Sequence, residues 1–151
     1  MPNPSEDTSI PTSPTSEQQA NNELQLNQPV VMIVDDELQV LDIARRLIER
    51  LGYRVLAESD PQAAYARYTT EHGQISCVLL DLAMRPIDGL ELFAMMRSIN
   101  PQVCAILCSG YSESGSAEHY IRLGFIGFLP KPYRIDELRK VLANVLDGMV
   151  E

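Results

Sequence analysis

The stretch Cys77-Val78-Leu79-Leu80-Asp81 is a short apolar run that ends abruptly in a carboxylate. An apolar run of this length, bounded by turn residues, is typical of a strand that is buried on both faces of a parallel sheet. Its last residue, Asp81, would then lie at the carboxyl end of the strand, where α/β sheets place their ligands. The stretch therefore predicts both a fold class and the position of a site.

Four further strands are predicted around this one, and helical patterns alternate with all of them. Alternation of this kind indicates a doubly wound α/β fold, a five-stranded parallel sheet with five helices on its two faces. Pro130 follows the last run and fits only an edge strand or a strand end, so we place that strand at the margin. The strands are expected over residues 30–34, 53–57, 77–81, 103–108 and 127–129, and the helices over 38–51, 60–72, 90–99, 113–123 and 135–146.

Size, charge and hydropathy exclude several classes of protein. The chain has 151 residues, of which 45% are hydrophobic, and this provides for one globular domain. Its formal net charge of −9 argues against nucleic acid as a direct partner. The apolar runs are too short to span a bilayer, and Met1-Pro2-Asn3-Pro4 does not open a secretory signal. We therefore expect a cytoplasmic protein that contacts neither nucleic acid nor membranes.

Residues 1–28 differ in composition from the rest, because they are rich in Pro, Ser, Thr, Glu, Gln and Asn. Such a segment cannot bury enough apolar surface to offset its ordering entropy, so a disordered tail is predicted. The folded domain is expected over residues 29–147, with a short C-terminal end over 148–151. No output domain is expected after the last helix, which favours a stand-alone protein.

Polar side chains mark the ends of the predicted strands. Asp35 and Asp36 follow the first strand, Asp81 ends the third, Ser109 follows the fourth, and Lys131 comes shortly after the fifth. Right-handed crossovers bring all these ends to one edge of the sheet. Two carboxylates about 4 Å apart repel by roughly 4 kcal/mol at an effective dielectric of about 20. Three carboxylates therefore need a cation to remain ionised together.

Mg²⁺ suits such a group of hard oxygen ligands, because it keeps several waters and favours a site completed by a phosphate oxygen. Lys131 would supply a second positive charge beside that oxygen. The ionised carboxylate of Asp81 would be the nucleophile, and Ser109 could donate its hydroxyl to the new phosphoryl oxygen. These residues predict a Mg²⁺-dependent phosphoryl acceptor.

Each of these residues also has an ordinary structural role when it is taken alone. Asp35 suits a helix N-cap and Asp81 a turn. Lys131 suits an exposed surface, Ser109 a loop, and Phe128 the hydrophobic core. Their joint occurrence at the ends of successive strands is what favours a common site.

Five separated motifs together resemble the receiver domain of bacterial two-component response regulators, a flavodoxin-like fold with strand order 2-1-3-4-5. The resemblance covers residues 29–147 and rests on the order and spacing of the motifs. They are Val34-Asp35-Asp36, Asp81 with Met84 and Asp88-Gly89-Leu90-Glu91-Leu92, Ser109-Gly110-Tyr111, Phe128, and Lys131-Pro132.

The resemblance implies a role for each site residue. Asp81 is the expected phosphoacceptor and, with Asp36, a direct Mg²⁺ ligand. Asp35 is expected to act through water, and the backbone carbonyl of Ala83 is expected to complete the protein ligands. Lys131 is expected to contact the phosphoryl group, with a cis bond to Pro132.

The resemblance also implies a switch and an output surface. Ser109 is the expected switch hydroxyl and Phe128 the switch aromatic. The expected output surface comprises the fourth helix, the fifth strand and the fifth helix, and carries Tyr120, Phe128 and Tyr133. The chain departs from the family at Arg85, where a proline is usual, although Pro86 follows directly. Arg85 either adds positive charge near the phosphoryl group or points to solvent.

The function implied is a receiver in a phosphorelay, with no turnover of a separate substrate. A histidine kinase or a histidine phosphotransfer protein would phosphorylate Asp81, and the signal would pass to a downstream protein or a second copy. One alternative is a phosphohydrolase, which needs a second acid where Ala83 stands. The other is an interaction module that keeps the receiver fold but works without phosphorylation.

Overall fold

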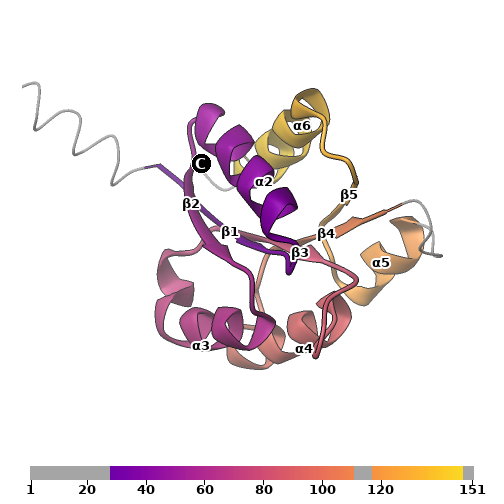
Figure 1. The fold of residues 1–151 in the computed structure, drawn as a ribbon. Coiled ribbons are helices and arrows are strands. Elements are labelled where there is room, and N and C mark those ends of the chain that lie inside the picture. The colour runs from indigo at the N-terminus through magenta and orange to yellow at the C-terminus, as the bar shows by residue number, and fades with distance from the viewer. Residues whose placement is uncertain (1–27, 111–116, 148–151) are drawn as a thin grey trace, which may run out of the picture.

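The computed structural model describes residues 28–110 and 117–147, and within them five parallel strands form one sheet (Figure 1). The sheet order is β2-β1-β3-β4-β5, as the resemblance predicted. The strands are β1 (Val30–Val34), β2 (Arg54–Glu58), β3 (Cys77–Asp81), β4 (Ala105–Ser109) and β5 (Gly127–Pro130).

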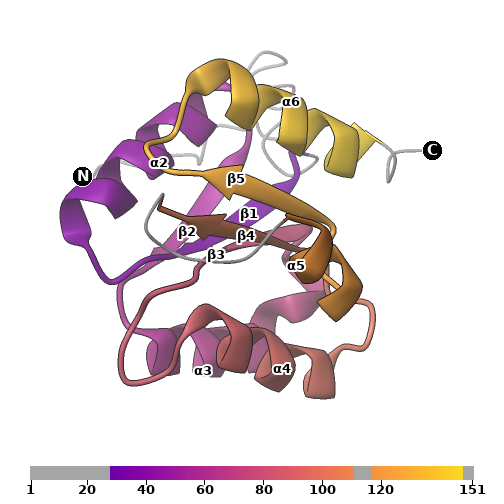
Figure 2. The same ribbon diagram turned by 90° about the vertical axis from the view of Figure 1, so that its right-hand side faces the viewer.

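Helices cover both faces of this sheet. In Figure 2, α2 and α6 lie on one side of the strands and α3 and α4 on the other. The short α5 belongs with α4, because its Tyr120 joins the core cluster of the α3 and α4 face. The helices are α2 (Leu38–Arg50), α3 (Pro61–Glu71), α4 (Gly89–Ile99), α5 (Ala117–Leu123) and α6 (Ile135–Leu146), and a 3₁₀ turn, η1, covers His72–Gln74.

The apolar runs of the sequence become the three inner strands. Every residue of β1, β3 and β4 is buried, because helices cover both sides of each strand. The edge strands β2 and β5 are only partly buried. Pro130 ends β5 at the sheet margin, as predicted, where its missing N–H breaks no inner ladder.

Local capping chemistry explains where the first two helices start and stop. Asp60 caps α3 by accepting a hydrogen bond from the Gln62 N–H at 3.1 Å. Gly52, at φ 102°, follows the end of α2 in a conformation that residues with a side chain rarely adopt. These features confirm the predicted boundaries of the first two helices to within one or two residues.

One predicted strand boundary and one predicted exposure differ from the structure. The strand expected from Val103 begins at Ala105, because the Val103 N–H closes a turn on the Asn100 carbonyl at 3.0 Å. The expected start of the fourth helix, at residue 113, lies outside the described residues. Tyr120 was expected on the output surface, and this was wrong: it is 4% exposed and packs against Phe125 and Phe128.

The described helices include none that is long and apolar enough to cross a membrane.

Candidate functional site

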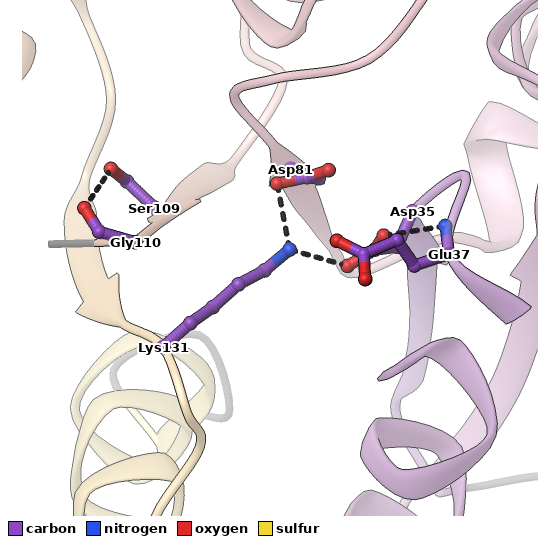
Figure 3. A network of polar contacts seen from close by, with 6 residues as sticks. All are labelled: Asp35, Glu37, Asp81, Ser109, Gly110 and Lys131. Atoms are coloured by element: carbon purple, nitrogen blue, oxygen red, sulfur yellow. Dashed lines mark hydrogen bonds and ion pairs between the residues drawn. The ribbon is translucent and has the colours of Figure 1, made fainter. Parts of the chain in front are cut away.

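The carboxyl ends of the inner strands bring the predicted site residues to one edge of the sheet (Figure 3). Asp35 directly follows β1, and Asp81 and Ser109 are the last residues of β3 and β4. All three are buried although they are polar. Because β3 lies between β1 and β4, Asp81 occupies the centre of the group.

Lys131 joins two of these carboxylates. Its Nζ lies 2.7 Å from Asp35 Oδ2 and 2.8 Å from Asp81 Oδ1, and its side chain is 15% exposed. The Lys131 backbone N–H donates to the Ser109 carbonyl at 2.8 Å, which fixes the residue after β5 against the end of β4. The packing of the strand ends therefore directs the lysine side chain toward the two carboxylates, as Figure 3 shows.

Asp36 completes an acidic cluster at the rim. One carboxylate oxygen from each of Asp35, Asp36 and Asp81 lies within 4.8 Å of the others. Asp36 is exposed, whereas both oxygens of Asp35 are engaged, one by Lys131 and the other by the Glu37 N–H at 2.9 Å. Asp36 and Asp81 thus have the carboxylates that are open to a further ligand.

The electrostatics of the cluster favour a bound cation. Burial raises the pKa of Asp81 to about 6; the hydrogen bond from Lys131 opposes this shift and the charge of Asp35 adds to it. Burial alone would lower the pKa of Lys131, but its hydrogen bonds to Asp35 and Asp81 outweigh burial and raise it to about 12. When all are ionised, three carboxylates and one ammonium leave a charge of −2. A divalent cation with oxygen ligands fits this donor set.

The loop after Asp81 contains two residues with predicted effects on the site. Ala83 and Arg85 are both exposed, which agrees with the interpretation of Arg85 as a side chain in solvent. The Lys131–Pro132 bond is cis, as predicted, and the Arg85–Pro86 bond is cis as well.

Gly89 is a site-shaping residue whose specific role the sequence did not reveal. A Cβ at this position would overlap the backbone carbonyl oxygen of Asp81. The Gly89 N–H donates to the Leu82 carbonyl at 2.9 Å, so the start of α4 packs directly against the end of β3. Asp88, the residue before Gly89, caps α4 by accepting a hydrogen bond from the Glu91 N–H at 2.8 Å. A cap followed by glycine is a signal that can indicate such a close approach.

The two predicted switch residues lie on the neighbouring strands β4 and β5. The Ser109 hydroxyl lies 3.1 Å from the Gly110 carbonyl, to which it donates, and on the side of Asp81 away from Asp35 (Figure 3). Phe128 is half-buried on β5 and stacks on Tyr120, with ring centroids 5.8 Å apart and planes within 3°. Ser109 is paired through its strand with Pro130, two residues beyond Phe128.

Comparison with known proteins identifies the family. The family model of the response regulator receiver domain matches residues 31–143. The chain belongs to the response regulator receiver family. The receiver fold accounts for the strand order and for the acidic edge.

Individual relatives of this receiver domain are distant. Sporulation initiation phosphotransferase F of Bacillus subtilis is 26% identical over 116 residues, which cover 77% of the chain and 92% of that protein. The putative two-component response regulator ARR21 of Arabidopsis thaliana is 29% identical over 118 residues, 78% of the chain and 19% of that protein. The chain thus spans only a small part of some of its curated relatives.

A solved receiver structure agrees with the fold. The receiver domain of AraT, a response regulator from Geobacillus stearothermophilus, is 30% identical and superimposes with a TM-score of 0.70. The match covers 80% of this chain and 94% of the AraT domain. The predicted family and fold are therefore confirmed, while the roles of the individual site residues stay predictions.

Proposed function

We propose that this receiver domain accepts a phosphoryl group on Asp81 from a phosphohistidine of a histidine kinase or a histidine phosphotransfer protein. The observation that supports this best is the bridge from Lys131 Nζ to Asp81 Oδ1 at 2.8 Å, inside a cluster of three carboxylates. A structural ion pair needs only one acid, whereas this cluster combines an excess of oxygen ligands with one amine. The proposal implies a cytoplasmic location.

The transfer uses the carboxylate of Asp81 as the nucleophile. One of its oxygens forms a bond to phosphorus while the bond from phosphorus to the imidazole nitrogen of the donor breaks, and the electron pair returns to that nitrogen. Lys131, already within 2.8 Å of Asp81, stabilises the negative charge of the transferring group. Asp35 holds the lysine from the other side at 2.7 Å and so orients it.

Mg²⁺ fits the same cluster as the cofactor. Asp36 and Asp81 would hold it directly, Asp35 through water, and the Ala83 backbone carbonyl would complete the protein ligands. When bound, the ion would neutralise charge on the phosphoryl oxygens and on the acids. The exposed position of Asp36 leaves the rim accessible from solvent.

Phosphorylation changes the surface through Ser109 and Phe128. The phosphoryl group adds about −1.5 to −2 charges, which attract the Ser109 hydroxyl away from Gly110. Phe128 then turns toward the space that Ser109 leaves, and the face made of α5, β5 and α6 changes shape. This face would contact a downstream protein or a second copy.

Labelling with acetyl phosphate tests the proposal. In the presence of Mg²⁺, intact-mass analysis is expected to show one added phosphoryl group on the wild type and none on Asp81→Asn. Asp88→Asn serves as the control, because Asp88 caps α4 and lies outside the acidic cluster. Continuous release of phosphate without stable label would indicate a phosphohydrolase instead. A complete absence of label would favour an interaction module that works without phosphorylation.

A further inference from the structure

A groove between α4 and α5 lies outside the proposed phosphorylation site and is lined mostly by apolar side chains. Its volume is about 570 Å³. It belongs to the α3 and α4 face of the sheet, whereas α2 and α6 cover the other face (Figure 2). Its main lining residues are Leu90, Phe93, Ala94, Arg97, Leu123 and Phe125.

Arg97 provides the groove with a fixed positive charge. Its Nη2 donates to the Leu123 carbonyl at 2.9 Å, and its guanidinium carbon lies 4.5 Å from the centroid of the Phe93 ring. Gly124, at φ 116°, makes room for this group, because a Cβ there would overlap the guanidinium. The arginine is thus held across the gap between α4 and α5 by contacts at both ends.

Arg97 is held by a backbone carbonyl and an aromatic ring rather than by a carboxylate. Arg45, Arg67 and Lys131 each contact carboxylates. Among residues 28–110 and 117–147, Arg97 pairs with none, although acids outnumber bases by 21 to 12 in the chain. A preorganised guanidinium over an aromatic ring, surrounded by apolar side chains, is suited to a carboxylate carried by an apolar ligand.

Exposed apolar residues lie at the end of α5, the helix that forms one wall of the groove, and just after it. At the end of α5 and just after it, Ile121, Leu123 and Ile126 are 48%, 40% and 42% exposed. A small molecule in the groove would leave these side chains in water, whereas a polypeptide segment could cover them. Of the three, Leu123 also lines the groove, and exposed apolar side chains at an apolar groove are typical of protein interaction sites.

Aromatic contacts connect this groove to the switch residue. Phe128 stacks on Tyr120, Tyr120 meets Phe125 edge-on at 6.5 Å, and Phe125 stacks on Phe93 at 4.1 Å. Phe125 and Phe93 line the groove. A displacement of Phe128 would therefore change the packing of Tyr120 and, through it, the floor of the groove.

We propose that the groove between α4 and α5 binds an apolar segment of a partner protein that presents a carboxylate to Arg97, and that Phe128 controls its affinity. The second part rests on the proposed phosphorylation of Asp81, whereas the first does not. Closely packed aromatic rings that have two arrangements can couple two sites in this way.

Peptide selection tests the first part on the full-length, unphosphorylated chain. Short random peptides displayed on phage are expected to yield binders with one acidic side chain among apolar residues. Fluorescence anisotropy should then show about tenfold weaker binding to Arg97→Gln, because a charge-assisted hydrogen bond is lost. Ala94→Trp should block binding by filling the groove, and Arg50→Gln, exposed on α2, should leave binding unchanged.

Charge exchange provides the sharpest control. A peptide whose acid is replaced by lysine should bind Arg97→Glu better than wild type. If Arg97→Gln and Ala94→Trp bind every selected peptide as tightly as the wild type does, the groove proposal is wrong. If the chain instead forms a dimer that Arg97→Glu dissociates, the occupant is a second copy and the partner assignment is overturned.

The second part is tested by measuring peptide affinity before and after phosphorylation with acetyl phosphate and Mg²⁺. We expect a change of about fivefold or more in the wild type, within the usual range of coupling between sites, and none in Asp81→Asn. A phosphorylated protein with unchanged affinity would overturn the control by Phe128 but not the proposed function. An absence of label would overturn the proposed function. The groove proposal would then be decided by peptide binding to the unphosphorylated chain alone.

Discussion

At the scale of single residues, the site is organised by one lysine amine that forms ion pairs with two buried carboxylates. Asp35 is fully buried and Asp81 is 4% exposed, so neither charge is well solvated. Lys131 compensates both of them at distances below 3 Å. The same lysine therefore serves the stability of the fold and the proposed chemistry, and its removal should affect both.

Replacing Lys131 by methionine should lower the free energy of unfolding by about 3 kcal/mol, because it leaves buried carboxylates without a partner. Urea titration at neutral pH measures this loss. Lys140→Met, on the exposed face of α6, is the control and should change stability little. Adding Asp35→Asn to Lys131→Met should recover part of the loss; a double variant less stable than Lys131→Met alone would contradict the explanation.

Replacing Asp81 by asparagine should stabilise the fold at neutral pH by about 1–2 kcal/mol. The folded-state pKa of Asp81 is about 6, above the ordinary value of 3.8, so the folded chain binds a proton more tightly than the unfolded chain. For this group, stability falls as pH rises from about 4 to 6 and then stays level. In Mg²⁺-free buffer, the difference in unfolding free energy between Asp81→Asn and the wild type should grow over that pH range. A difference that stays constant with pH would contradict the raised pKa of Asp81.

The lifetime of the phosphorylated state should depend on Ala83. This exposed residue has no side-chain group that can orient an attacking water. Ala83→Asn should therefore shorten the half-life of phosphorylated Asp81 by roughly fivefold, since an amide can position water near the phosphorus. Loss of label over time measures this, and a longer half-life in the variant would refute the role given to position 83.

At the scale of elements, the ends of strands and the starts of helices position the site. The apolar runs that end at Asp35 and Asp81 could be recognised in the sequence because both faces of an inner strand are apolar. The bond from Lys131 to Asp35 could not, because it joins residues 96 positions apart and depends on how the two strand ends pack. Tyr120 was misplaced because the seven residues of α5 show too little periodicity to define a buried face.

Gly89 gives a test of the contact between α4 and the end of β3. Gly89→Ala should lower stability by about 1–3 kcal/mol and slow phosphorylation, because its Cβ would push the loop away from the Asp81 carbonyl. Gly73→Ala is the matched control, since a Cβ there meets nothing within 4 Å. Gly89→Ala should unfold at a lower temperature and be labelled more slowly than Gly73→Ala. Equal unfolding temperatures and labelling rates would show that the loop moves to accommodate the Cβ without loss of stability.

At the scale of the whole molecule, the acidic edge concentrates part of a net charge of −9 in one small volume. A folded state that gathers carboxylates in this way is destabilised relative to the unfolded chain, where they separate. A cation that binds only the folded arrangement reverses this cost and couples the stability of the entire domain to the site.

Mg²⁺ should therefore stabilise the whole domain, and the size of the effect is predictable. At a free concentration about ten times the dissociation constant, one bound ion adds about 1.4 kcal/mol to the free energy of unfolding. Asp36→Asn should abolish most of this gain, because Asp36 is the exposed acid of the cluster, while Asp42→Asn on α2 should retain it. Thermal unfolding with and without Mg²⁺, at equal ionic strength, separates specific binding from screening. A gain that persists in Asp36→Asn would show that the ion acts on the general acidity of the domain, and the cluster would then lose its assignment as a cation site.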